Sequence, residues 1–163
     1  MHNVRLDSVD ATPRPLLAIG TDYAPGTLLD FHVHRRAQML YAMTGLMEVE
    51  TDDGAWVIPP YSGVWIPAGK RHRVRMQSAS TRSLYIEPEA APRSSTHCEV
   101  LVITPLLHHL LLASLALPAL YEEDGRDDAW LNCFCMKSVW RKPCRSLPPS
   151  LKTHPWPSSA KTF

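Results

Sequence analysis

The fold is decided by the stretch Gly26-Thr-Leu-Leu-Asp-Phe-His32-Val-His34-Arg-Arg-Ala-Gln38, together with the later segment Pro67-Ala-Gly69-Lys-Arg-His72. Two histidines one residue apart on a strand point to the same side, because side chains alternate with period two. A third histidine, His72, follows a Pro/Gly turn on a later strand. Three imidazoles and a side-chain oxygen that converge inside a small β-barrel would form a divalent transition-metal site.

The first stretch resembles the first of the two motifs of the cupin superfamily. That motif has Gly, five residues, His-x-His, three or four residues, Glu, six residues and Gly. The spacing matches from Gly26 through His32 and His34 to Gly45. The departure is Gln38, which stands where the family usually has Glu. A neutral amide is a poorer metal ligand than a carboxylate, so Gln38 either completes the ligand set or orients a histidine.

The second segment resembles the second cupin motif, Pro-x-Gly-x-x-His-x-x-x-Asn. Pro67, Gly69 and His72 fit it, whereas Gly63 lies closer to Pro67 than usual and Met76 replaces Asn. The resemblance implies a mainly β fold, the double-stranded β-helix or jelly-roll barrel of the cupins. It also implies a site for zinc, nickel or iron, with the ligands His32, His34, Gln38 and His72.

The sequence from about residue 10 to residue 128 is also similar to the N-terminal sensor domain of AraC-type transcription regulators. The residues that carry this likeness include Tyr41, Thr51, Gly54, Trp56, Pro59, Pro60, Trp65, Thr104 and Tyr121. The resemblance implies that the barrel binds a small-molecule effector and that a following helix pairs two chains. In that family a helix-turn-helix region then enters the major groove of DNA.

Length and composition limit the alternatives. The 163 residues suggest one domain with appendages, and a hydrophobic content of 45% is enough to bury a core. A net charge of +1 gives no electrostatic case for nucleic-acid binding by this chain alone. No apolar signal segment follows the N-terminus, and none of the four cysteines forms Cys-x-x-Cys, so we expect a cytoplasmic protein without a disulfide framework. The apolar run 106–120 is too short to predict a membrane span.

Many short segments separated by turn residues predict a barrel or sandwich. The predicted strands cover residues 16–19, 27–34, 39–43, 46–51, 56–58, 63–66, 72–76, 82–87 and 99–103. We expect His72, Val74 and Met76 to lie on one face of their strand, with Arg71, Arg73 and Arg75 on the opposite, solvated face.

The hydrophobic period changes at Thr104-Pro105, which together suit a helix N-cap and first helical position. Leucines at three- and four-residue spacing, among them Leu106, Leu110 and Leu117, then predict an amphipathic helix. This leucine face could pack on its own barrel, but we favour pairing with a second copy in a homodimer. We therefore divide the chain into a barrel sensor domain (1–103), a dimerisation helix with its linker (104–128) and a tail (129–163).

The tail changes composition abruptly after Asp128. Residues 130–140 show no amphipathic period, and five prolines crowd residues 143–157. In another reading frame, the codons of residues 130–143 permit a leucine- and glutamate-rich helix of the kind that the regulator family has there. We therefore predict that the tail is a disordered frameshift product and that the helix-turn-helix domain was lost with the frame.

Four residues are candidates for binding the effector: Arg36, Gln38, Tyr41 and Trp65. Arg36 could contact an anionic ligand bidentately or lie in a solvated turn. The aromatic residues Tyr41 and Trp65 could stack on a ligand, as could Trp56 and Tyr85, or they could be ordinary barrel core.

Three hypotheses of function follow. The first is the effector-sensing and dimerisation module of an AraC-type regulator, without its own DNA-binding domain. The second is a small metal-dependent cupin enzyme, an oxygenase or isomerase, but no general base stands among the motif residues and we assign no catalytic residue. The third is a non-functional product of a frameshifted gene.

Overall fold

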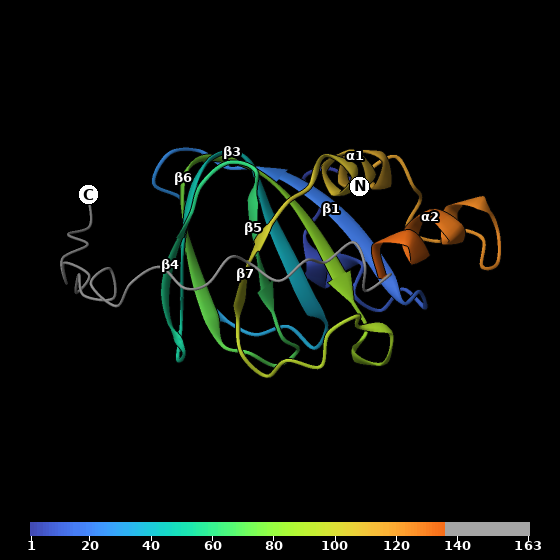
Figure 1. The fold of residues 1–163 in the computed structure, drawn as a ribbon, viewed down its shortest axis with the longest axis horizontal. Coiled ribbons are helices and arrows are strands. Elements are labelled where there is room, and N and C mark those ends of the chain that lie inside the picture. The colour runs from blue at the N-terminus through green and yellow to red at the C-terminus, as the bar shows by residue number, and fades with distance from the viewer. Residues whose placement is uncertain (136–163) are drawn as a thin grey trace.

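The computed structural model describes residues 1–135 of the chain, and the prediction of a disordered tail falls largely on residues 136–163, which lie outside the described part. The described residues form a β-barrel with two helices against one side (Figure 1). The strands are β1 (Leu16–Asp22), β2 (Leu28–His32), β3 (Ala37–Thr51), β4 (Gly54–Ile58), β5 (Ser62–Ile66), β6 (His72–Ile86) and β7 (Glu99–Val102). Two short 3-10 turns, η1 (Leu6–Ser8) and η2 (Pro88–Ala90), lie outside the strands. The predicted jelly-roll barrel is confirmed.

The barrel consists of two antiparallel sheets that share their two longest strands. One sheet has the order β1-β6-β3-β5-β7, and in the other β2 pairs with β6 and β4 pairs with β3. Each shared strand is fifteen residues long, so each was predicted as two separate strands. The register between β3 and β6 shifts on both sides of Thr44, and these irregularities bend the strands from one sheet into the other.

Gly45 lies at this bend and explains why the motif needs a glycine there. Its φ of +71° lies in the left-handed region, and a Cβ atom at this position would lie 2.2 Å from the carbonyl oxygen of Ser78. Ser78, opposite on β6, also has a positive φ of 51°. Only glycine accommodates both the conformation and the close approach of the two strands.

The space between the two sheets is filled by an inner cluster of apolar side chains. Its buried members are Leu40, Ala42, Met47, Val49, Ile58, Val64, Ile66, Val74, Met76, Ala79 and Cys98. His72, Val74 and Met76 are buried, whereas Arg73 and Arg75 between them are partly exposed, so the predicted alternation along this strand is confirmed.

An outer cluster lies on the opposite face of the larger sheet, beneath helix α1 (Pro105–Ser114). Thr104 caps α1 as predicted, because its hydroxyl accepts a hydrogen bond of 3.3 Å from the backbone N–H of Leu107. Leu107, Leu110 and Leu111 all pack against the strands. The dimer face predicted through Leu110 is therefore wrong, because this side chain is 5% exposed and lies in the chain's own core.

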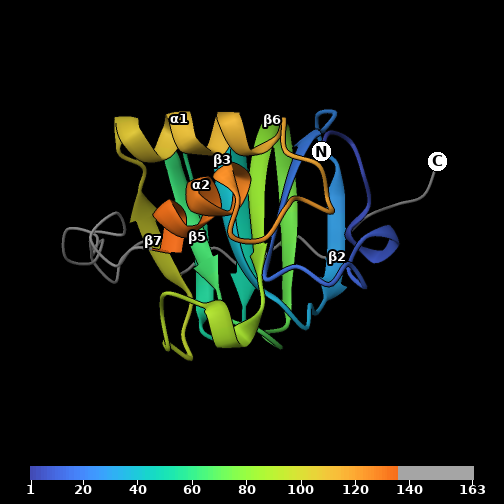
Figure 2. The same ribbon diagram turned by 90° about the vertical axis from the view of Figure 1, so that its right-hand side faces the viewer.

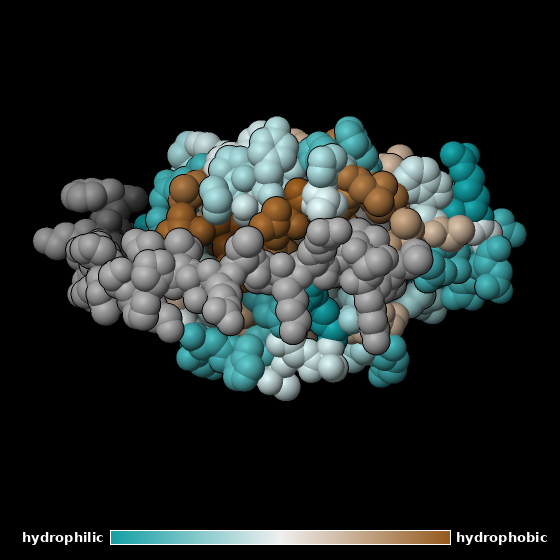
Figure 3. Space-filling view, viewed as in Figure 1, coloured by the Kyte–Doolittle hydropathy of each residue, from teal (hydrophilic) through white to brown (hydrophobic). Residues whose placement is uncertain are grey.

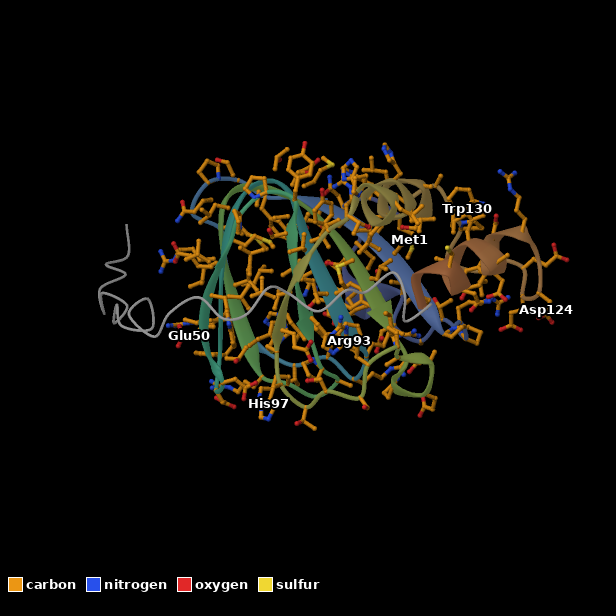
Figure 4. All side chains as sticks on the ribbon, viewed as in Figure 1. Met1, Glu50, Arg93, His97, Asp124 and Trp130 are labelled. Carbon is orange, nitrogen blue, oxygen red and sulfur yellow. The ribbon has the colours of Figure 1, made fainter. Side chains whose placement is uncertain are left out.

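A second helix, α2 (Arg126–Cys135), covers the same face of the sheet as α1 (Figure 2). Leu131 of α2 is 3% exposed and belongs to the outer cluster, whereas Trp130 (Figure 4) is 38% exposed. The prediction that regular structure ends at residue 128 is wrong for residues 129–135. One anchoring leucine in a short helix is too weak a periodic signal to be read from the sequence. Neither of the two helices in residues 1–135 is long and apolar enough to cross a membrane.

Candidate metal centre

The three histidines of the two motifs meet at one end of the barrel interior. His32 ends β2 and His72 begins β6, and the two residues are direct partners in the antiparallel register. β2 ends at His32, two residues earlier than predicted, so His34 lies in the segment that follows this strand. The backbone N–H of Gly69 donates a hydrogen bond of 2.8 Å to the carbonyl oxygen of His34. This bond ties the first motif to the turn of the second and brings His34 to the site.

The three rings pack closely around a common point. The ring centroids lie 4.8 Å apart for His32 and His34, 4.3 Å for His32 and His72, and 4.9 Å for His34 and His72. One ligand nitrogen from each ring lies within 4.8 Å of the other two. Two nitrogens bound to one ion can be at most about 4.2 Å apart, twice a zinc–nitrogen distance of about 2.1 Å. A small contraction of the side chains therefore brings them to coordination distance.

Backbone carbonyls fix the tautomers of two of the rings. His32 Nδ1 lies 2.6 Å from the carbonyl oxygen of Asp30, and His72 Nδ1 lies 2.9 Å from that of Lys70. A carbonyl can only accept, so both Nδ1 atoms carry the proton and donate. Each Nε2 then holds a lone pair, which is the arrangement that prepares histidine for a metal.

The environment keeps two of the rings neutral. Burial lowers the pKa of His34 from 6.5 to about 4, and neighbouring His32 contributes in the same direction. The Gln38 side chain and the carboxylates of Asp10 and Asp7 act in the opposite direction on this pKa. Burial also lowers the pKa of His72 to about 4. Both rings are neutral at pH 7, as metal binding requires.

Gln38 is the polar side chain next to His34 on the neighbouring strand β3. Its amide nitrogen donates hydrogen bonds of 3.1 Å each to Ser83 Oγ and to the hydroxyl of Tyr85. The ring of Tyr85 in turn meets the ring of His34 edge-on, with centroids 5.3 Å apart. In this orientation Oε1 of Gln38 is buried and accepts no hydrogen bond from the described residues. A buried oxygen without a donor costs roughly 1–3 kcal/mol, so this atom suits a metal ion or a ligand donor.

Arg36 does not lie in a solvated turn, and that interpretation is wrong. Its side chain is fully buried and forms salt bridges of 2.9 Å to Asp10 and 2.7 Å to Glu87. The guanidinium also donates to the carbonyl oxygens of Asp10, Thr12 and Arg14. These contacts hold the N-terminal segment against the start of β3, and the structure does not bring Arg36 into the triad.

The two aromatic candidates lie on the other face of the sheet from Gln38. Tyr41 and Trp65 are each at most 1% exposed and belong to the outer cluster beneath the helices. The Tyr41 hydroxyl lies 2.7 Å from Nδ1 of His108 on α1. A role for either residue in binding an effector stays a prediction.

Sequence reasoning missed the polar partners that support the site. Ser83 holds Gln38, and Asp10 and Glu87 hold Arg36. Alternation could have found Ser83, because it lies two residues from Tyr85 on the same strand and so faces the same side. The role of Asp10 could not be predicted from a sequence pattern. Asp10 lies in an irregular segment, and its partner Arg36 is 26 residues away.

Comparison with known proteins places the chain in a family. Residues 15–129 match the family described as the AraC-like ligand binding domain. The chain therefore belongs to this family, and its barrel is a ligand-sensing domain.

Among curated proteins, the chain is 35% identical over 116 residues to the HTH-type transcriptional regulator NimR of Escherichia coli K12. The match covers 69% of this chain and only 42% of NimR. Two solved structures of ToxT from Vibrio cholerae share the fold. The apo K231A variant gives a TM-score of 0.57 at 10% identity, covering 76% of this chain and 54% of ToxT. The second ToxT structure gives a TM-score of 0.55 at 7% identity, and the match covers 77% of this chain and 56% of ToxT.

Proposed function

We propose that the barrel senses a small-molecule effector through a divalent transition metal held by His32, His34 and His72. The observation that supports this proposal is the convergence of three rings of which two have Nδ1 committed to backbone carbonyls. Gln38 Oε1 is the fourth protein atom available at the site. Bound metal would supply an electrophilic centre on which an effector can be fixed.

The test is metal binding by the purified chain. We expect one equivalent of zinc, nickel, cobalt or iron(II) per chain by elemental analysis, with a higher melting temperature in the presence of metal. His72→Ala should abolish both effects. The matched control is His109→Ala, because His109 is exposed on α1 and should leave metal binding unchanged. Stoichiometric metal that survives His72→Ala would refute the site.

The similarity to a transcription regulator supports a role for this chain in transcription regulation. NimR is an HTH-type regulator by name, and this chain spans less than half of its length. We infer that the described residues contribute effector binding in the cytoplasm and that DNA contact requires a helix-turn-helix region outside them. The corresponding test is gel-shift binding to promoter DNA, in which residues 1–135 alone should show no sequence-specific complex.

Pairing of two chains is the second part of the proposal, and a revised surface supports it. Residues 101–121 contain no Asp, Glu, Lys or Arg, although only one side of α1 faces the core. Val102 and Leu106 are 59% and 58% exposed, and hydrophobic surface runs across this side of the molecule toward α1 (Figure 3). A helix without charged residues whose outer side also has exposed apolar side chains is normally covered by a neighbour.

Sedimentation velocity tests this pairing. We expect Leu106→Glu to shift a homodimer to monomer, because it puts a charge into the contact. Val57→Glu is the matched control, since Val57 on β4 is equally exposed but lies outside the uncharged stretch. A wild-type chain that sediments as a monomer at high concentration would contradict homodimerisation.

A further inference from the structure

The charge around the triad points to the chemical class of the effector. The ligand set contains three imidazoles and an amide, all of them neutral when they bind a metal ion. A divalent ion in this set would keep both of its positive charges. The cupin pattern with glutamate at position 38 would cancel one of them, so Gln38 is the residue that leaves the charge uncompensated.

Among the described residues, no carboxylate belongs to the cluster of potential ligands, and the nearby carboxylates are paired or exposed. The carboxylates of Asp10 and Glu87 are both paired with the guanidinium groups of Arg35 and Arg36. Asp53 is paired with Lys70 at 2.7 Å. Asp7 is exposed beside Arg5, and Asp30 and Arg71 are both exposed to solvent. The charged groups near the site therefore balance one another. The charge of a bound metal ion would have to be neutralised by the metal's own ligands.

The polar neighbours of the triad are hydrogen-bond donors rather than anions. The hydroxyls of Ser83 and Tyr85 flank the Gln38 amide, and a hydroxyl can donate to a bound anion. The remainder of the barrel interior is closed by apolar side chains such as Leu40, Val64 and Met76, each at most 3% exposed. The polar end with the histidines is therefore the part of the barrel interior that offers polar partners to a small group.

We infer that the effector is a small anion whose carboxylate or comparable oxygen donor completes the three-histidine metal centre. Gln38 selects this anion because its amide, unlike a glutamate at the same position, adds no negative charge to the ligand set. This inference rests on the proposed metal site and goes beyond it by naming the ligand class. An anion in this position neutralises charge at short range in a partly buried site, where electrostatic attraction is far stronger than in water.

The experiment uses the full chain loaded with cobalt(II), whose visible absorption reports its ligands. Acetate and acetamide have the same shape and differ in charge, so their titration into the wild type needs no variant. We expect acetate to change the cobalt spectrum and to bind at least about tenfold more tightly than acetamide. Equal affinity of the two probes would overturn the inference while leaving the metal site intact.

Gln38→Glu then tests the role of the residue. Glutamate should fold here, because Ser83 and Tyr85 can donate to a carboxylate as readily as they accept from an amide. We expect acetate affinity to fall by at least about tenfold, with imidazole, a neutral metal ligand, changed by less than about threefold. Equal weakening of both probes would show that glutamate blocks the position rather than adding charge, and would overturn the selection by charge.

The matched control is Gln77→Glu, the same change at an exposed position further along β6, which should leave both affinities unchanged. Failure of the wild type to take up cobalt would refute the proposed metal site itself. Normal uptake without an acetate preference would refute only the effector class.

Discussion

The two faces of the larger sheet use the same strands for different purposes. On the outer face, alternate residues of β3 and β5 such as Met39, Tyr41 and Trp65 pack under α1 and α2 in an almost wholly apolar layer. On the inner face, Leu40 and Ala42 continue into the polar end formed by Gln38 and the histidines. The difference teaches that packing under the helices stabilises the outer face of this sheet, whereas the inner face has polar groups at the proposed metal and ligand site.

Removing a buried charge at the polar end should have the largest effect on stability. Arg36→Ala leaves Asp10 and Glu87 without their buried partner, and we expect the free energy of unfolding to fall by about 3–5 kcal/mol. Arg35 contacts the same two carboxylates but its side chain is 51% exposed, so Arg35→Ala should cost less than about 1 kcal/mol. Urea denaturation measures both, and equal losses would contradict the distinction.

A cavity on the outer face should come next. Leu111 on α1 is 0% exposed, and Leu111→Ala removes buried apolar atoms and leaves a void. We expect a loss of about 3 kcal/mol in the free energy of unfolding. Metal affinity of the folded fraction should stay unchanged, since the residue lies on the face opposite the triad. Val57→Ala, at an exposed apolar position on β4 outside the proposed dimer surface, should change stability by less than about 0.5 kcal/mol.

Acid should weaken the inner face specifically. Burial holds the pKa of His34 and of His72 at about 4 in the folded protein, against 6.5 for an ordinary histidine. As the pH falls below 6.5, the unfolded chain takes up protons on these rings and the folded protein does not, so stability decreases until the pH reaches the folded pKa. At about pH 5 the metal-free protein should have lost about 1–2 kcal/mol for each ring relative to pH 7.

Urea titrations at the two pH values test this dependence. His72→Asn should flatten it, because one of the two buried rings is gone. His109→Asn should not, because this ring is exposed. An unchanged slope in His72→Asn would show that other groups cause the acid sensitivity.

The helix cap should give the smallest effect. Thr104→Ala removes the hydroxyl that accepts from Leu107 N–H, and we expect a loss of about 1 kcal/mol in the free energy of unfolding. Thr96→Ala in the loop before β7 is the control, since this residue is exposed, and it should cost less than about 0.5 kcal/mol. Thermal denaturation of the two variants side by side distinguishes them.

Local patterns predicted more of the fold than of the surroundings of the site. Alternation and turn residues identified the strands, and the capping of α1 by Thr104 followed from local chemistry. The convergence of His32, His34 and His72 followed from the spacing of the two motifs and their resemblance to the cupins. These features depend on neighbours in sequence or on motif pairs with fixed geometry.

What failed depended on contacts between distant segments. Arg36 is buried only because Asp10 and Glu87, 26 and 51 positions away, meet it in space. The leucines of α1 could pack against the barrel or against a second chain, and their periodicity fits both. Leu110 was therefore predicted at a dimer interface, whereas it packs in the chain's own core. Helix α2 is held by the packing of Leu131, and a single contact of this kind leaves no period in the sequence.

The continuity of β3 and β6 through both sheets also governs how the chain must fold. Each sheet contains half of each long strand, and the larger sheet cannot assemble before residues as distant as Leu16 and Ile86 have found their register. Pairings at such sequence separations slow folding, typically to milliseconds or seconds. Because the two halves share their strands, they should form and melt in one cooperative transition. The histidine cluster therefore has no smaller autonomous unit, and a peptide carrying only residues 26–76 should remain an unfolded chain.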